Sequence, residues 1–122
     1  MIAPIAYGLT ILLALGIIVI GIRFILAPQA SSAGYGVPFD GGGRAYLAAK
    51  GLRDVTYGVL GLVLLVVGGA HLVGWFIAIA AIVPLGDTLI VLRHGGTRTV
   101  AFGVHFATAM AMLAASALLF AL

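Results

Sequence analysis

The sequence predicts an all-α integral membrane protein, a four-helix bundle in which each helix crosses the bilayer. Of its 122 residues, 64% are apolar and only 7% are charged. Its mean hydropathy of +1.32 leaves too little polar surface for a soluble domain. A bilayer core about 30 Å thick is crossed by a helix of about 20 residues, and this length divides the single domain into spans.

The first span is predicted at residues 3–26. Its apolar run carries no charge before Arg23, and Pro28 prevents the helix from continuing. No basic segment precedes the run, so it is predicted to be a retained span and not a cleaved signal peptide. Residues 27–49 contain two prolines and three consecutive glycines, which predict a long loop that leaves room for a short interfacial helix at 45–50.

Three more spans follow the loop. The apolar stretch from Val55 to Leu92 is too long for one span, so the chain must turn back within it. Three glycines predict this turn within residues 68–75, GGAHLVGW. The next turn is predicted at residues 93–98, RHGGTR. The predicted spans are residues 53–70, 74–92 and 99–121.

The basic residues predict the orientation of these spans. All of them fall on the side that holds the first and third loops: Arg23, Arg44, Lys50, Arg53, Arg93 and Arg98. By the positive-inside rule this side is cytoplasmic, so both termini lie on the non-cytoplasmic side of the inner membrane. The three acids, Asp40 in the loop, Asp54 and Asp87, fall near the same side.

Each span delivers an ionisable side chain to a common depth. These residues are Arg23 in the first span, Arg53 and Asp54 in the second, Asp87 in the third and His105 in the fourth. An ionised group facing lipid costs a few kcal/mol, so such side chains turn inward and pair or line a cavity. The sequence therefore predicts a buried or half-buried ionic layer between the helices.

Helical periodicity supports an inward direction for this layer. Asp54 shares one face of its helix with Gly58 and Gly61, and glycine faces are where membrane helices approach closely. In the third span Asp87 shares a face with Pro84, and in the fourth His105 belongs to a stripe of residues at helical spacing. A polar layer between tightly packed helices is predicted.

Candidate roles follow from the chemistry of these groups. Asp87, His105 and Asp54 are the candidate catalytic residues, because a carboxylate and an imidazole at matched depth can exchange a proton. Arg23 and Arg53 are the candidate ligand-binding residues. The alternative is structural: Arg53 and Asp54 could only pair to fix helix packing, Asp87 could be a plain partner of an arginine, and the other basic residues, Lys50 included, are topology anchors.

Several site classes are not expected. The chain has no cysteine, and its three histidines lack metal-ligand spacing, so neither a metal nor a cofactor is predicted. The six dispersed basic residues form no patch with interleaved aromatics, so nucleic acid is not an expected partner.

The motifs GIRFILAP, AYLAAKGLRDVTYG and PLGDTLIVL, together with His105, resemble a family of small four-span membrane proteins known only as a domain of unknown function, close in character to DoxX-like proteins. The resemblance covers nearly the whole chain. It implies a four-helix membrane bundle with Arg23, the Lys50 to Asp54 block, Asp87 and His105 as its polar signature. It implies no activity.

Three functions remain open from the sequence. The leading hypothesis is a membrane protein that binds a small lipophilic or amphipathic molecule between its helices, with transformation of that molecule left open. The second is a proton-coupled transporter acting as a homodimer, and the third is a structural or accessory membrane subunit. Membrane lipid is the expected environment, and the small-residue helix faces favour a homo-oligomer.

Overall fold

The computed structural model describes residues 1–39 and 41–122, and within them it is helical, with no strand. The predicted all-helical class is therefore confirmed for the described residues. Asp40, which the sequence places in the first loop, lies outside them.

The first long helix, α1, spans Ile2–Leu26 and is interrupted at Ala27, the residue before a proline. Pro28 then occupies the first turn of a second helix, α2 (Pro28–Tyr35), where a missing N–H costs nothing. This helix ends at Gly36, whose φ of 105° is left-handed. The structure thus differs from the predicted loop at 27–49, because α2 occupies its first part.

The third helix, α3, spans Arg44–Val67, and so begins well before residue 53. Gly68 alone separates it from α4 (Gly69–Ala80), and Gly69, the first residue of α4, has a φ of 77°, which a side chain would disfavour. The reversal therefore falls inside the stretch 68–75 that the glycines predicted, at its first two residues.

The helix after this turn continues with a break at Ala81 into α5 (Ile82–Arg93). Pro84 lies just beyond the break and has no N–H to give to the preceding turn, which explains the interruption. The last segment consists of α6 (Arg98–Val100), the π-helix η1 (Ala101–Phe106) and α7 (Ala107–Phe120).

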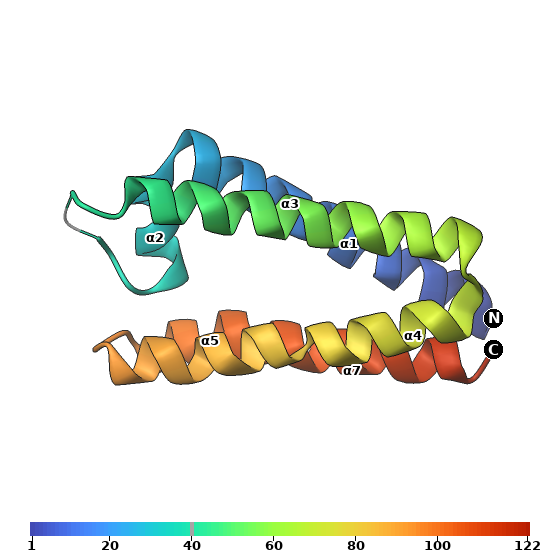
Figure 1. Cartoon of the computed structure of the whole chain (residues 1–122). Coiled ribbons are helices and arrows are strands. Elements are labelled where there is room, and N and C mark those ends of the chain that lie inside the picture. The colour runs from blue at the N-terminus through green and yellow to red at the C-terminus, as the bar shows by residue number, and fades with distance from the viewer. Residues whose placement is uncertain (40) are drawn as a thin grey trace.

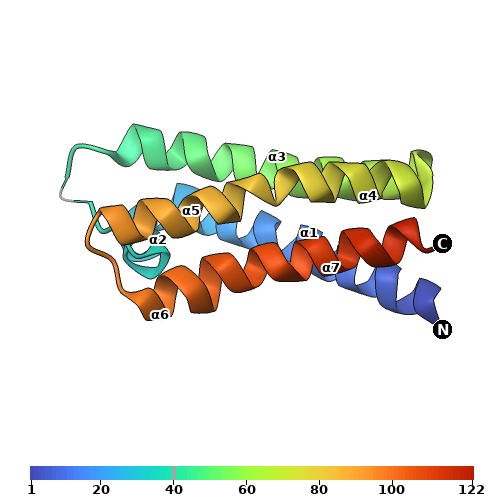
Figure 2. The same ribbon diagram turned by 90° about the horizontal axis from the view of Figure 1, so that it is seen from below.

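The helices form two layers (Figure 1). In one layer α1 packs along α3, and in the other α4 and α5 run beside α7 and η1 (Figure 2). Both termini lie at one end of the molecule, while α2 lies at the opposite end, between the layers (Figure 1). Helix α2 is therefore positioned to contribute side chains to the space between the layers.

Glycines allow the close approach of α1 and α3. A Cβ built on Gly21 would lie 2.5 Å from the carbonyl oxygen of Gly51, and one built on Gly58 would lie 2.6 Å from that of Ala14. Gly51, Gly58 and Gly61 are all buried, as is Asp54 on the same face. The predicted glycine face is confirmed.

The two layers join near the termini through an apolar core made by Ala6 of α1, Val73 and Ile77 of α4, and Leu119 of α7. The buried Ser116 hydroxyl of α7 donates a hydrogen bond of 2.8 Å to the carbonyl oxygen of Gly74 in α4. This packing closes the end near the termini, and the space between the layers extends from Ile77 toward α2.

In the part of the chain that the structure describes, three helical segments are long and apolar enough to cross a membrane: Ile2–Leu26, Gly69–Arg93 and Arg98–Phe120. Helix α3 is long enough, with 24 residues. It differs from the other three segments in its charge. Any stretch of 18 of its residues contains the three charged side chains of Lys50, Arg53 and Asp54.

Candidate ligand-binding site

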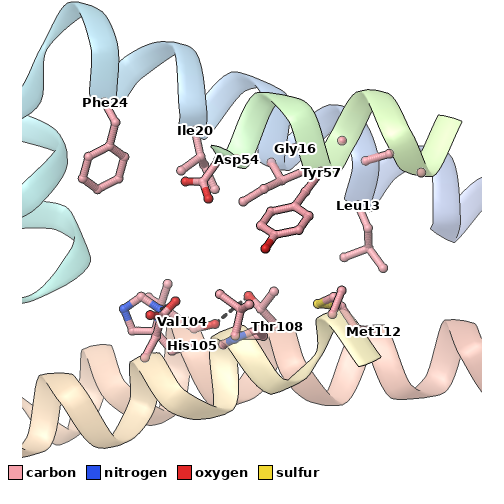
Figure 3. Close-up of a pocket in the computed structure, with 18 of the residues that line it drawn as sticks. Leu13, Gly16, Ile20, Phe24, Asp54, Tyr57, Val104, His105, Thr108 and Met112 are labelled. Carbon is pink, nitrogen blue, oxygen red and sulfur yellow. Dashed lines mark hydrogen bonds and ion pairs between the residues drawn. The ribbon is translucent and has the colours of Figure 1, made fainter. Parts of the chain in front are cut away.

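A cavity of about 500 Å³ lies between the two layers. Figure 3 shows Leu13, Ile20 and Tyr57 on one side of it, with Val104, Thr108 and Met112 on the other. The walls are mostly aliphatic, and ionisable side chains gather toward α2. The cavity is thus amphipathic along its length.

Asp54 of α3 lies at the polar end of the cavity and is only 5% exposed. One of its carboxylate oxygens accepts a hydrogen bond of 2.7 Å from the Nζ of Lys50, one helical turn earlier. The same ammonium lies 4.2 Å from the centre of the buried Phe24 ring, a cation–π contact. The charge of Asp54 is therefore balanced within its own helix.

Asp87 of α5 faces the same cavity from the other layer. Its Oδ1 accepts a hydrogen bond of 2.7 Å from the hydroxyl of Tyr35, the last residue of α2. Burial, and then this hydrogen bond, raise the pKa of the Tyr35 phenol above its ordinary value. The phenol therefore stays protonated and serves as the donor.

His105 of η1 completes the cluster. Its Nε2 lies 2.7 Å from the backbone carbonyl oxygen of Tyr35, and its Nδ1 lies 3.9 Å from Oδ2 of Asp87. The side chain is buried, and its ring lies 4.6 Å from that of Tyr35. Its position in a π-helix is notable because such single turns are frequent at functional sites.

The two arginines predicted to bind a ligand, Arg23 and Arg53, differ in their position relative to the cavity. Arg23 lines the cavity and is exposed, and it makes no ion pair with any residue in the described ranges. Arg53 is exposed and is not among the cavity-lining residues. Arg53 is therefore placed apart from the cavity that it was predicted to serve as a ligand-binding residue, and the alternative pairing with Asp54 is not seen either, since Asp54 pairs with Lys50 and successive helix residues point about 100° apart.

Three residues that the sequence analysis did not select belong to the site. Lys50 was interpreted as a topology anchor, although its spacing of four from Asp54 is an ion-pair signal. Tyr35 and Ser31 lie in the segment predicted as loop, and no sequence signal pointed to them. Ser31 lines the cavity, and its buried Oγ has no hydrogen-bond partner within the described part of the chain.

The cluster thus combines acids from opposite layers, a lysine, an imidazole and a phenol around one cavity. Such a set can bind a polar head group and can accept or release a proton. Among residues 1–39 and 41–122 there is no group of three or more His, Cys, Asp or Glu side chains that could hold a metal ion.

A family model described as a domain of unknown function (DUF4267) matches residues 14–119. The matched range includes every charged residue that lines the cavity, as well as Tyr35 and His105. Comparison with curated proteins and with solved structures finds no match. The likeness to DoxX-like proteins stays a prediction.

Proposed function

The chain belongs to the DUF4267 family of unknown function, and from its cavity we propose that it is a membrane protein that binds a small amphipathic molecule between its helices. The observation that carries this proposal is the amphipathic cavity, aliphatic along its walls and ionisable at the end near α2. Its volume of about 500 Å³ is in the range of small-molecule pockets.

The proposal includes a four-span arrangement in which α3 crosses the membrane together with the three more apolar segments. The charges of α3 are compatible with this, since they lie in its N-terminal half, where Lys50 pairs with Asp54 beside the cavity and the long Arg53 side chain can extend toward the basic end of the molecule. The termini share one end of the molecule (Figure 1) and the basic loops share the other. Orientation by the positive-inside rule then places the loops in the cytoplasm and the termini outside the inner membrane.

Cysteine labelling tests this topology directly, because the native chain has no cysteine. In intact cells, a membrane-impermeant maleimide is expected to label Leu122→Cys and not Gly42→Cys. Gly42 is exposed, and a Cβ there meets no atom within 4 Å, so the substitution leaves the fold intact. Labelling of Gly42→Cys before permeabilisation would contradict the proposed orientation.

The cavity favours a ligand with one polar end. Ionisable side chains come from α1, α2, α3, α5 and η1, whereas toward the termini the walls are formed by residues such as Leu13, Ile77 and Met112. A fully polar solute would lose hydrogen bonds to water against these apolar walls, and a pure hydrocarbon would leave the ionisable groups without a partner. An alkyl chain with a single polar head satisfies both parts.

A cavity-filling substitution is expected to abolish this binding. Gly16 lines the cavity, and a Cβ there meets no atom within 4 Å, so the backbone tolerates a side chain at this position and the ring of Gly16→Phe takes up cavity space (Figure 3). Gly8→Phe is the matched control, because Gly8 is equally unobstructed on the same helix and does not line the cavity. The measurement is equilibrium dialysis of radiolabelled decylamine, decanol and decanoate against protein in nanodiscs.

Saturable binding of at least one of the three probes, lost in Gly16→Phe and kept in Gly8→Phe, is the expected result. Empty nanodiscs correct for partition into lipid. If none of the probes binds above that background, or if both variants bind equally, the cavity is not a ligand site and the structural-subunit hypothesis takes its place.

A further inference from the structure

The two acids of the cavity differ in how their charge is balanced. Asp54 has Lys50 at 2.7 Å, whereas Asp87 has no lysine or arginine within ion-pair distance among the described residues. The partners of Asp87 are the neutral phenol of Tyr35 and the imidazole of His105. Since a compensating charge stabilises a carboxylate between helices, Asp87 is suited to bind a cation.

The hydrogen bond of His105 determines which nitrogen is available. The Tyr35 carbonyl oxygen can only accept, so Nε2 of His105 must carry the proton that it donates. A neutral His105 therefore presents the lone pair of Nδ1 toward Oδ2 of Asp87, at 3.9 Å. Nδ1 and Oδ2 are then both hydrogen-bond acceptors, and they lie too far apart for a direct hydrogen bond. The contact becomes favourable when a proton or a hydrogen-bond donor lies between them.

Within the described residues, no lysine or arginine forms an ion pair with Asp87. From α2 comes the neutral Tyr35, and from α3 the Lys50–Asp54 pair, which is internally balanced. Arg23 of α1 lies at an exposed position on the cavity wall and makes no ion pair in the described ranges. Asp54 also has a second carboxylate oxygen that accepts no hydrogen bond from residues 1–39 or 41–122.

We propose that the polar head of the ligand is a protonated amine, and that the Asp87–His105 pair holds either this ammonium or a proton on Nδ1, but never both. The inference rests on the proposed function and specifies its ligand class. An ammonium donates several hydrogen bonds, which suits Oδ2 of Asp87, Nδ1 of His105 and the second oxygen of Asp54. The alkyl part extends along the aliphatic wall, and the ring of Tyr57 lines the space beside the head (Figure 3).

Mutual exclusion follows from charge. When Nδ1 is protonated, the imidazolium compensates Asp87 and repels a second cation at the same place. When His105 is neutral, the ammonium compensates Asp87 instead, and the displaced proton goes to solvent. A site that exchanges a lipophilic cation for a proton has the two loaded states that a proton-coupled exchanger requires.

The test uses the intact protein in nanodiscs with decylamine as the probe and decanol as the neutral probe of equal chain length. Because a primary amine titrates near pH 10.4, decylamine stays protonated from about pH 5.5 to about pH 8, and any change in its affinity reports on the protein. Decylamine is expected to bind more weakly at the lower pH. Calorimetry in buffers of different ionisation enthalpy is expected to show release of up to about one proton on binding.

Two variants separate the parts of the proposal. Asp87→Asn should weaken decylamine binding about 30-fold or more and decanol binding much less, because it removes the negative charge and keeps a side chain that can still hydrogen-bond a hydroxyl. His105→Gln keeps an N–H donor for the Tyr35 carbonyl but removes the Nδ1 acceptor, so it should weaken decylamine binding less than Asp87→Asn does, while the pH dependence and the proton release are lost. If Asp87→Asn does not fold, the pH dependence in the wild type and its loss in His105→Gln decide the matter.

The outcomes distinguish this inference from the proposed function. Decanol or decanoate binding that Gly16→Phe abolishes, with no decylamine binding, overturns the amine head and leaves the cavity as a ligand site. Decylamine binding without proton release, and with equal affinity at both pH values, overturns the shared position of proton and ammonium. Absence of binding by all three probes overturns the proposed function itself.

Discussion

Gly21→Ala is expected to destabilise the protein strongly by forcing α1 away from α3. The added Cβ would lie 2.5 Å from the carbonyl oxygen of Gly51 and 2.8 Å from the backbone nitrogen of Val55. Both atoms belong to the backbone of α3, so a side-chain rotation cannot relieve the clash. Overpacking of this kind costs about 1 to 3 kcal/mol, and here whole helices must shift.

The matched control is Gly8→Ala on the same helix, where a Cβ meets no atom within 4 Å. This change is expected to leave the stability of the protein unchanged or to raise it by about 0.5 to 1 kcal/mol, because alanine lowers the conformational entropy of the unfolded chain relative to glycine. Thermal unfolding in detergent, followed by the loss of monodisperse protein, measures both variants. Equal midpoints for the two would show that α1 and α3 do not pack through Gly21.

Lys50→Met is expected to produce the second large loss of stability. It leaves Asp54, whose side chain is 7% exposed, without its cation, and removes the ammonium from the Phe24 ring. Breaking a fully buried pair costs about 3 to 5 kcal/mol, and partial exposure of the Lys50 side chain, 32%, reduces this to about 1 to 3 kcal/mol.

Arg53→Met is the matched control, since Arg53 is a basic residue of the same helix that is exposed and makes no ion pair in the described ranges. Its effect on the unfolding midpoint is expected to be small. The double variant Lys50→Met/Asp54→Leu should recover much of the stability lost in Lys50→Met, because the unpaired charge is then absent. A larger loss from Arg53→Met than from Lys50→Met would contradict the observed pairing.

Much of the helical layout was predictable because its signals are local. Long apolar runs identify α1 and the segments after Gly69, and the glycines at 68 and 69 identify the reversal. Helix α2 was not predictable in the same way. Its eight residues, PQASSAGY, have a composition typical of loops, and they form a helix that buries Pro28, Ser31 and Ser32 against other parts of the fold.

The residues of the candidate site also fall into those that local sequence signals predicted and those that depend on helix packing. The cost of an ion in hydrocarbon singles out Asp54, Asp87 and His105 from the sequence, and all three line one cavity. The choice between Lys50 and Arg53 required helical geometry, because only the residue four positions away points to the same side as Asp54. Tyr35 required the tertiary structure, since it meets Asp87 across 52 positions of sequence.

By itself the sequence determined that the protein is helical and apolar enough for a membrane. It also determined that its few charged side chains must lie between the helices or near the membrane surface. Both conclusions follow because hydropathy and the cost of burying a charge are properties of each residue on its own. Only the tertiary structure decided that α2 enters between the layers and that Tyr35 joins Asp87 to His105. Those contacts depend on where distant helices pack, and no pattern within one helix specifies the distance to another.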